Sequence, residues 1–485
     1  MDIYLAAVIG YLVVLVGIAV YKMRSVKTQD DFMVAGRKTS AFFLAGTLVC
    51  TWIGSGSLFG GAGLAFRTGI SELWMSAGAW VGIVIVYFLA HRVRRISQYT
   101  VSDILEKRYN AAARLLGTSA IIIAYLTIAG YQFRGAGRLL NILTGIDPVM
   151  GGAITCGVVI LFTVLAGLVS IISIDLINGI IMTVGVLVAL PLAFVAVGGS
   201  HQLATLPAER FTVFGDNNWV WAMGVFFPTF FLLLGESSMY QKFFSAKDES
   251  TARKAVIYMI VGVVVIETAL NLLSVVGSSK YLAMAPFVGP DGAFDKATTE
   301  TIVLHLARFD LPTFAGVLLI CAAVAIILST ANTFLMIPST NIARDIYQRF
   351  LNPKASEETI IWFQRFWIVV LGVLAFVLAN FFQSILDMAF TAYTMVGAGI
   401  TPALLAAFLW KRVTVQGGVA SIASGMGVTL LITFLNFFTA EPLVKTDYII
   451  IPAAIASLVA LVTVSLLTAP SPEDKWKPFM QNMKM

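Results

Sequence analysis

Apolar residues along this chain are grouped in long runs, and short polar and basic stretches separate the runs. A helix needs about 20 apolar residues to cross a hydrocarbon core of about 30 Å, and thirteen runs are long enough. The pattern therefore predicts an all-α polytopic membrane protein with about 13 transmembrane helices. The predicted spans are 3–21, 41–66, 70–91, 115–142, 149–168, 172–198, 219–240, 255–280, 313–338, 361–381, 384–410, 417–438 and 446–468.

The composition excludes an ordinary soluble chain. Of 485 residues, 59% are hydrophobic and 12% are charged, whereas charged residues make up about a quarter of a typical soluble protein. Cys50, Cys156 and Cys321 all lie in apolar runs, with neither a paired spacing nor a nearby histidine cluster. We therefore expect packing cysteines and no disulfide framework or zinc site.

Basic residues mark one side of the membrane. When the loops are assigned alternately to two sides, 24 of the 32 lysines and arginines fall on one side. The positive-inside rule makes that side the cytoplasm. We expect a cell (inner) membrane protein with its amino terminus outside and its carboxyl terminus in the cytoplasm, and a first span that is retained as a helix. The net charge of +6 then reflects these loops and not a nucleic-acid partner.

The second predicted span, TLVCTWIGSGSLFGGAG, carries five glycines and two serines. Irregular backbone at bilayer depth is tolerated only where it lines a protein cavity or a polar site. An interrupted helix would free backbone carbonyls around Cys50 to Ile53. The alternative is close helix packing through small residues. No strand precedes the run, so it does not indicate a nucleotide-binding loop.

The ninth predicted span contains ILSTANT, a cluster of polar side chains in an otherwise apolar helix. The cluster consists of Ser329, Thr330, Asn332 and Thr333. Adjacent hydroxyls and a carbonyl freed three residues earlier are hard oxygen ligands, which suit sodium and other hard cations. The alternative is that each hydroxyl bonds the carbonyl one turn back in its own helix.

Among the ionisable residues inside predicted spans, where each charge costs about 2.5–3.5 kcal/mol on insertion scales, four are singled out as candidates. Asp175 could complete a cation site or cap the start of a helix. Arg134 and Arg138 are four residues apart and share a helix face. Glu236 could bind a substrate or a proton, or it could pair with a buried arginine.

Several of these stretches, taken together, resemble the sodium/solute symporter family, which includes sodium-coupled carriers of sugars, proline, pantothenate and sialic acid. The resemblance covers residues 1 to 415 in order. It rests on DDFMVAGRK and TVSDILEKRYN in the first two cytoplasmic loops, WIGSGSLFG, SIDLING, YQKFFSAKD, ILSTANT followed by ARDIY, and TPALLAAFLWKR.

The resemblance implies a five-plus-five inverted repeat of the LeuT-like type, with a discontinuous first core helix and binding near the midplane. We expect the following order of segments. Residues 1–40 form the first helix and a cytoplasmic loop, 41–198 the first repeat, 199–218 an external loop, 219–412 the second repeat, and 413–485 two further helices and a cytoplasmic tail.

The resemblance also implies a sodium site. Its ligands would be the backbone carbonyls of Cys50, Ile53 and Ile326 and the hydroxyls of Ser329 and Thr330. A second sodium site that some members have would map to Asp175, Asn332 and Thr333, but those members usually carry hydroxyls where Asn332 stands. The sequence does not give the number of coupled ions.

The expected solute pocket departs from the known patterns of the family. Sugar carriers place Glu, Asn and Gln where this chain has Leu73, Glu236 and Thr391, and proline carriers have aromatic residues where it has Thr229 and Leu233. The residues expected to line the pocket are Ser57, Ser76, Tyr131, Gln132, Arg134, Glu236 and Tyr393. Arg134 is expected to bind a substrate carboxylate bidentately. The alternative is an Arg134–Glu236 ion pair that holds a gate.

These observations favour sodium-coupled symport of a small organic solute, with a carboxylate or an amino-acid-like compound as the substrate. The expected partners are this solute, the sodium ion and the lipid bilayer, with no obligate protein partner. A proton-coupled symporter that uses Asp175 or Glu236 is the first alternative. A channel or a transporter-like sensor is more distant, because no repeated carbonyl filter or charged ring is evident and no signalling domain follows residue 468. The three histidines have no catalytic spacing, so an enzyme is not expected.

Overall fold

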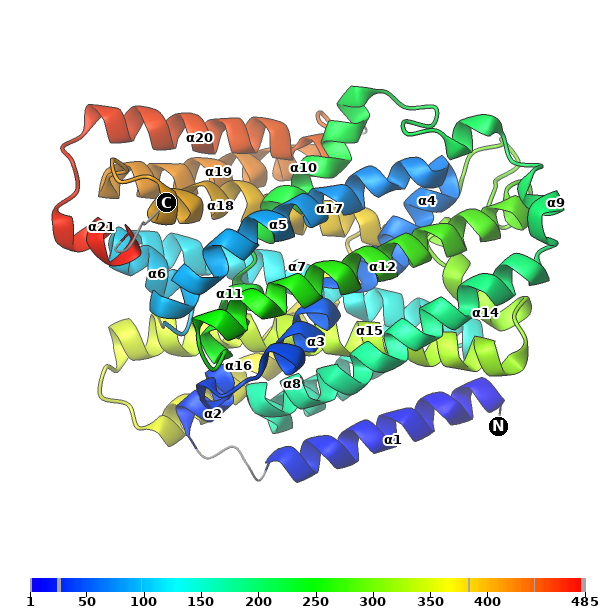
Figure 1. Cartoon of the computed structure of the whole chain (residues 1–485), viewed down its shortest axis with the longest axis horizontal. Helices are drawn as coiled ribbons and strands as arrows, with labels where there is room; N and C mark the ends of the chain where they lie inside the picture. The colour runs from blue at the N-terminus through cyan, green and yellow to red at the C-terminus, as the bar shows by residue number, and fades with distance from the viewer. Residues whose placement is uncertain (1, 24–27, 97, 383, 440, 481–485) are drawn as a thin grey trace.

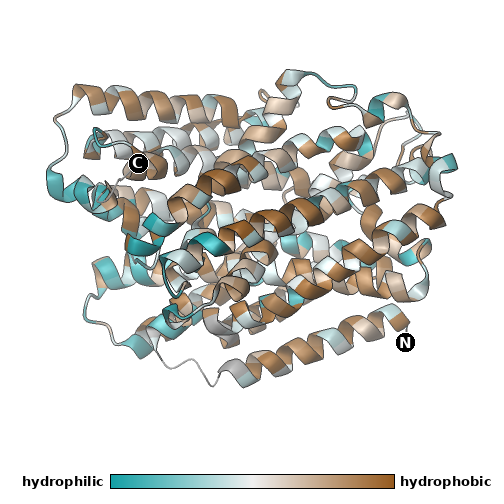
Figure 2. Cartoon of the chain, in the orientation of Figure 1, coloured by the Kyte–Doolittle hydropathy of each residue, from teal (hydrophilic) through white to brown (hydrophobic). Residues whose placement is uncertain are grey.

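The computed structural model describes residues 2–23, 28–96, 98–382, 384–439 and 441–480. Figure 1 shows a bundle of long helices that run in roughly the same direction across the molecule. Within the described residues, β-structure is limited to two isolated β-bridges. Figure 2 shows apolar residues along the middle of the helices and polar residues gathered toward the ends of the bundle.

Twelve helical segments of the described residues are long and apolar enough to span a bilayer, and they match twelve of the predicted spans. The exception is the second predicted span, because its helix is broken. Helix α3 (Ala41–Trp52) ends at Ile53, and the chain continues through η2 (Gly56–Gly61) into α4 (Ala62–Thr68). The predicted discontinuous helix is therefore present.

The remaining long helices follow in chain order. They are α1 (Ile3–Met23), α5 (Leu73–Ile96), α7 (Ala111–Thr144), α8 (Pro148–Ala196), α10 (Trp219–Gly235) with α11 (Ser237–Ser245), α12 (Glu249–Tyr281), α15 (Thr313–Thr340) with η5 (Asn341–Leu351), α16 (Glu357–Ala379), α17 (Ile385–Gly399) with α18 (Thr401–Leu409), α19 (Val415–Phe437) and α20 (Ile450–Leu467). Shorter helices occupy the connections: α2 (Gln29–Val34), α6 (Val101–Arg108), α9 (Gly199–Leu203), α13 (Lys296–Thr299), α14 (Ile302–Phe309) and α21 (Glu473–Met480).

Helix α8 contains two predicted spans and crosses the bundle twice. Its first part lines a cavity with Val324 of α15, and the Thr163 hydroxyl donates to Asn332 of α15 at 3.1 Å. Gly185, further along α8, packs against Ala322. The contacts of α8 thus move along α15 from Val324 to Asn332 and then return to Ala322. The chain therefore reverses direction between Thr163 and Gly185.

The two halves of the core are inverted with respect to each other. The first half comprises α3 with α4, α5, α7 and the two crossings of α8; the second comprises α10 with α11, α12, α15, α16 and α17 with α18. Thr39, just before α3, pairs with Ala246, just after α11. The start of the first helix of one half thus lies beside the end of the first helix of the other half, as a five-helix inverted repeat requires.

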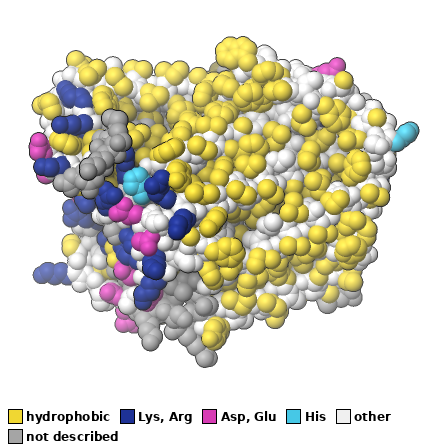
Figure 3. Space-filling view, viewed as in Figure 1, with side chains coloured by type: hydrophobic (Ala, Val, Ile, Leu, Met, Phe, Trp, Pro, Cys, Tyr) yellow, Lys and Arg dark blue, Asp and Glu magenta, His cyan; other side chains and the backbone are white. Residues whose placement is uncertain are grey.

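Charged side chains collect at one end of the bundle, which carries α6, the end of α11 and η5 (Figures 1 and 3). We call it the basic end. There Arg114 of α7 forms buried ion pairs with Asp103 of α6 and with Asp345 of η5. Figure 3 also shows a broad hydrophobic surface over the rest of the visible face, which suits contact with lipid.

Candidate functional site

The break in the second predicted span exposes backbone oxygens in the middle of the bundle. Ile53 has an extended conformation (φ −75°, ψ 99°), which turns its carbonyl away from the helix axis. Gly54 follows where helix α15 approaches closely. A β-carbon on Gly54 would lie 2.9 Å from the methyl group of Thr330 and 3.0 Å from Nε2 of Gln132, so a larger residue would displace both neighbours.

Helix α15 brings two hydroxyls to these oxygens. Oγ of Ser329 lies 3.0 Å from the Cys50 carbonyl and 3.3 Å from the Ile326 carbonyl. Oγ1 of Thr330 lies 3.1 Å from the Cys50 carbonyl and 3.2 Å from that of Ile53. The five oxygens implied by the family resemblance are thus together in one buried cluster. Carbonyl and hydroxyl oxygens are the ligands that hard cations accept.

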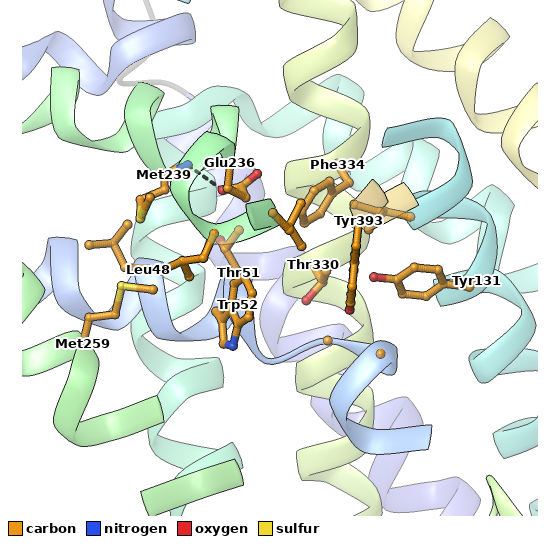
Figure 4. A pocket seen from close by; sticks show the side chains of 15 residues that line it. Leu48, Thr51, Trp52, Tyr131, Glu236, Met239, Met259, Thr330, Phe334 and Tyr393 are labelled. Carbon is orange, nitrogen blue, oxygen red and sulfur yellow. Dashed lines mark hydrogen bonds between the residues drawn. The ribbon is translucent and has the colours of Figure 1, made fainter. Parts of the chain in front are cut away.

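A pocket lies directly beside this oxygen cluster, and we call it the central pocket. Figure 4 shows Tyr131 and Tyr393 side by side, with Thr330 beside Tyr393 and with Trp52 next to Thr51 on the other side of Thr330. Its described lining is Leu48, Thr51, Trp52, Gly54, Gly56, Ile128, Tyr131, Leu232, Leu233, Glu236, Met239, Met259, Thr330, Phe334 and Tyr393. The pocket therefore lies between the broken helix, α7, α10, α15 and α17, and three of the predicted pocket residues line it.

Gln132 contacts the broken helix from α7. Its Oε1 accepts a hydrogen bond from the backbone N–H of Ser55 at 2.9 Å. Its Nε2 is buried and has no partner among the described residues, and neither has the Ser55 hydroxyl. Buried donors are rarely left unpaired in proteins, so an unpaired amide beside a pocket indicates a group available for a ligand.

Ser57 and Ser76 line a second cavity, which we call the outer chamber. Trp52 and Tyr393 line both cavities, which therefore adjoin each other. The outer chamber also contains two buried carboxylates, Glu72 and Glu267, neither of which is among the residues predicted from the sequence. Glu267 interrupts the apolar run VVVIETAL, so the criterion that selected Asp175 would also have selected it.

Glu236 lies at the break between α10 and α11 and caps the start of α11. Its carboxylate accepts from the backbone N–H groups of Ser238 at 3.1 Å and Met239 at 2.7 Å, and from the hydroxyl of Tyr125. A carboxylate at a helix N-terminus satisfies unpaired donors and the helix dipole. The Glu236 carboxylate thus has hydrogen-bond partners that give it a structural role, although Glu236 also lines the central pocket.

The structure places Arg134 outside the central pocket. Arg134 lies nine residues after Tyr125 on α7, about 13 Å along the helix axis from the residue that contacts Glu236. It lines a separate cavity with Arg138 and donates to the Ala379 carbonyl at 3.1 Å. None of the ion pairs within the described part of the chain joins Arg134 to Glu236. The guanidinium of Arg138 pairs with a different carboxylate, that of Glu300.

The residues of the expected second sodium site surround a lysine. The ammonium nitrogen of Lys242 lies 3.7 Å from the Asp175 carboxylate, 3.5 Å from the Thr333 hydroxyl and 3.1 Å from the Thr47 carbonyl. All four of these side chains are buried. Asn332 is engaged elsewhere, because its Oδ1 accepts from Thr163. Lys242 follows the predicted span 219–240 and would then lie in a cytoplasmic loop, whereas α11 carries it into the protein.

Comparisons with known proteins show the family to which the chain belongs. The model of the sodium:solute symporter family matches residues 32–425. The osmoregulated proline transporter OpuE of Bacillus subtilis is 25% identical, with 94% of this chain and 93% of the relative covered. The sodium/proline symporter of Staphylococcus aureus is 23% identical, with 96% and 92% covered.

A solved structure of a Na⁺-coupled sialic acid symporter, in a substrate-bound outward-open state, superposes with a TM-score of 0.80. It is 17% identical and covers 97% of this chain and 99% of its own. Mhp1, a nucleobase-cation-symport-1 family transporter, superposes with a TM-score of 0.57 at 11% identity, with 92% and 97% covered. The fold is thus that of transporters with inverted repeats. This chain belongs to the sodium:solute symporter family, whose members are membrane transporters and not enzymes.

Proposed function

We propose that this protein couples the inward movement of one sodium ion to the uptake of a small organic solute by alternating access. The observation that carries the proposal is the cluster of five oxygens between the broken helix and α15. Sodium bound there would tie Cys50 and Ile53 of the first half to Ser329 and Thr330 of the second half. The ion would thus favour one arrangement of the two halves over the other.

Coupling then follows from differential affinity. An ion that stabilises the arrangement in which the solute pocket is complete raises the affinity for solute, and the solute raises the affinity for the ion equally. Each positive charge that moves inward across 100 mV gains about 2.3 kcal/mol. For a solute without net charge, this free energy corresponds to about fiftyfold accumulation before any sodium gradient is added.

The basic end of the bundle is the cytoplasmic end in this proposal, in agreement with the positive-inside rule. The carboxyl-terminal helix α21 lies at this end in Figure 1, and the start of α1 lies at the opposite end. The amino terminus would then be outside and the carboxyl terminus in the cytoplasm. The bacterial relatives indicate the cell membrane as the location.

The solute is a carboxylate or an amino-acid-like compound in this proposal. Its carboxylate would accept from the unpaired Nε2 of Gln132 and the Ser55 hydroxyl at the broken helix. Tyr131 and Tyr393 would pack against its apolar part. The relatives named as proline transporters support an amino acid as the class of substrate. Arg134 has no part in this binding mode because it lines a different cavity.

A single sodium ion is proposed because the ammonium group of a lysine occupies the expected second sodium site. Lys242 already supplies a positive charge among Asp175, Thr47 and Thr333. Two cations at this position would repel each other in a medium of low dielectric constant. Proton coupling through Asp175 or Glu236 is the alternative. It is less favoured because one carboxylate is paired with Lys242 and the other caps α11.

The proposal is tested by uptake into proteoliposomes that contain the purified protein. A panel of small carboxylates and amino acids is offered under an inward sodium gradient, an inward proton gradient, or neither, at equal ionic strength. We expect at least one solute to accumulate with the sodium gradient and not with the proton gradient. Accumulation that follows the proton gradient in the absence of sodium would overturn the sodium assignment.

A further inference from the structure

The two carboxylates of the outer chamber are held in fixed positions by neutral donors. The indole N–H of Trp52 donates to one oxygen of Glu267 at 2.8 Å, and that of Trp80 donates to the other at 2.7 Å. The Ser57 hydroxyl lies 3.5 Å from the first oxygen. Neutral donors orient a carboxylate but leave its negative charge uncompensated.

Glu72 faces the same chamber from the turn before α5. Its Oε2 accepts from Nδ2 of Asn271 at 2.7 Å. Asn271 lies one helical turn after Glu267, so both side chains are on one face of α12. Asn271 therefore contacts Glu72 from the same face of α12 that carries Glu267, and all three line the outer chamber.

The amide oxygen of Asn271 has no hydrogen-bond partner among the described residues, and the side chain is only 2% exposed. An unpaired buried oxygen has a cost of about 1–3 kcal/mol unless a donor reaches it. Asn271 lines the chamber together with the two carboxylates. The missing partner of this oxygen is a hydrogen-bond donor, and the missing partner of the carboxylates is a positive charge.

No side chain of the described residues supplies that charge. The salt bridges of the described chain include neither Glu72 nor Glu267. By contrast, the buried carboxylates of Asp175, Asp345 and Glu300 each have a lysine or arginine partner, and that of Glu236 accepts from two backbone N–H groups at the positive end of the α11 dipole. Buried charges without a partner are unfavourable, so the exception indicates a cationic ligand.

We propose that the outer chamber binds the ammonium group of the solute. This inference rests on the function proposed above and adds that the solute is cationic or zwitterionic. The chamber has a cavity of about 20 Å³, which is room for one group of the size of water, such as an ammonium. Trp52 and Tyr393 line both cavities. A zwitterion would therefore extend from Glu72 and Glu267 to its carboxylate contact at Gln132.

The inference can be tested without knowing the solute, because methylammonium carries the proposed group alone. The thermal midpoint of the purified protein is measured in constant sodium while methylammonium chloride is titrated. Tetramethylammonium chloride at equal ionic strength is the control, since it has the same charge but no N–H donor and a larger size. We expect methylammonium to raise the midpoint and tetramethylammonium to have no effect, by mass-action linkage.

The variant for this test is the isosteric double substitution Glu72→Gln with Glu267→Gln. We expect it to lose the methylammonium shift and to keep the shift caused by sodium, which also shows that it is folded. Glu209→Gln, at an exposed position of the short helix Ala208–Phe211, should keep both shifts. Equal effects of methylammonium on the double variant and the original protein would overturn the inference, as would the absence of any methylammonium shift.

A sodium shift that disappears in the same double variant would also overturn it, because the chamber would then bind an inorganic cation. These failures differ from a failure of the proposed sodium coupling. That failure would be a midpoint that does not respond to sodium, or a sodium response that does not depend on Ser329 and Thr330.

Discussion

The ammonium nitrogen of Lys242 lies 3.7 Å from the carboxylate of Asp175, and both side chains are almost completely buried. The pair joins α11 of the second half of the core to α8 of the first half. The Lys242 ammonium also donates to the Thr51 hydroxyl in the broken helix. One buried charge pair therefore lies against the proposed sodium cluster, at the position where a second ion was expected.

Replacement of this lysine should add a second response to sodium to the one that the Ser329–Thr330 site already gives the original protein. In Lys242→Met, the Asp175 carboxylate is buried without a positive partner, a change that typically destabilises a protein by about 3–5 kcal/mol. Sodium can occupy the vacated space, so high sodium should recover most of the lost thermal midpoint. The double variant Lys242→Met with Asp175→Asn should lose this recovery. An equal sodium response in Lys242→Met and the original protein would contradict the assigned role of Lys242.

Gln132 should determine the affinity for solute without determining the affinity for sodium. In Gln132→Leu, the unpaired amide donor beside the central pocket is lost. A hydrogen bond to a charged group contributes about 1.5–3 kcal/mol, so KM for uptake should rise by at least about tenfold. Thr127→Ala on the same helix is the control, because its hydroxyl bonds only the Ile123 carbonyl one turn back. An unchanged KM in Gln132→Leu would show that the Gln132 amide does not bind the solute.

Two glycines of α19 should respond in opposite ways to the same substitution. A β-carbon on Gly425 would overlap the Ala398 carbonyl of α17, whereas one on Gly427 meets nothing within 4 Å. Gly425→Ala should lower the thermal midpoint because the contact with α17 must open. Gly427→Ala should leave the midpoint unchanged or raise it, because alanine favours a helix by up to about 1 kcal/mol. Equal midpoints for both variants would show that α19 does not pack on α17 as described.

The fold could be predicted from the sequence because apolar length alone identifies membrane spans. Twelve predicted spans match, and the remaining one contains the predicted break after Cys50. The reversal within α8 was expected as a loop, and only a few residues separate its two crossings, Pro148–Leu165 and Ser170–Ala196. Local composition predicts which segments cross the membrane more reliably than it predicts how they connect.

The site was only partly predictable, because its charged residues depend on which helices are neighbours. The hydroxyls of Ser329 and Thr330 could be identified from the family pattern. Arg134 could not be placed, because its depth along α7 relative to the central pocket depends on packing. Lys242 follows the break at Glu236, which starts a new helix and takes the lysine into the protein instead of into a loop.

The most direct test of the central claim is equilibrium binding of radioactive sodium to the purified protein in detergent. The protein is compared with Ser329→Ala combined with Thr330→Ala, and with the control Thr183→Ala, whose hydroxyl bonds only the Gly179 carbonyl of its own helix. We expect saturable binding of about one sodium ion per chain, unchanged in the control and weakened by at least about tenfold, or 1.4 kcal/mol, in the double variant. Equal sodium affinity in the double variant and the original protein would contradict the proposed site, and the absence of saturable binding would contradict sodium coupling itself.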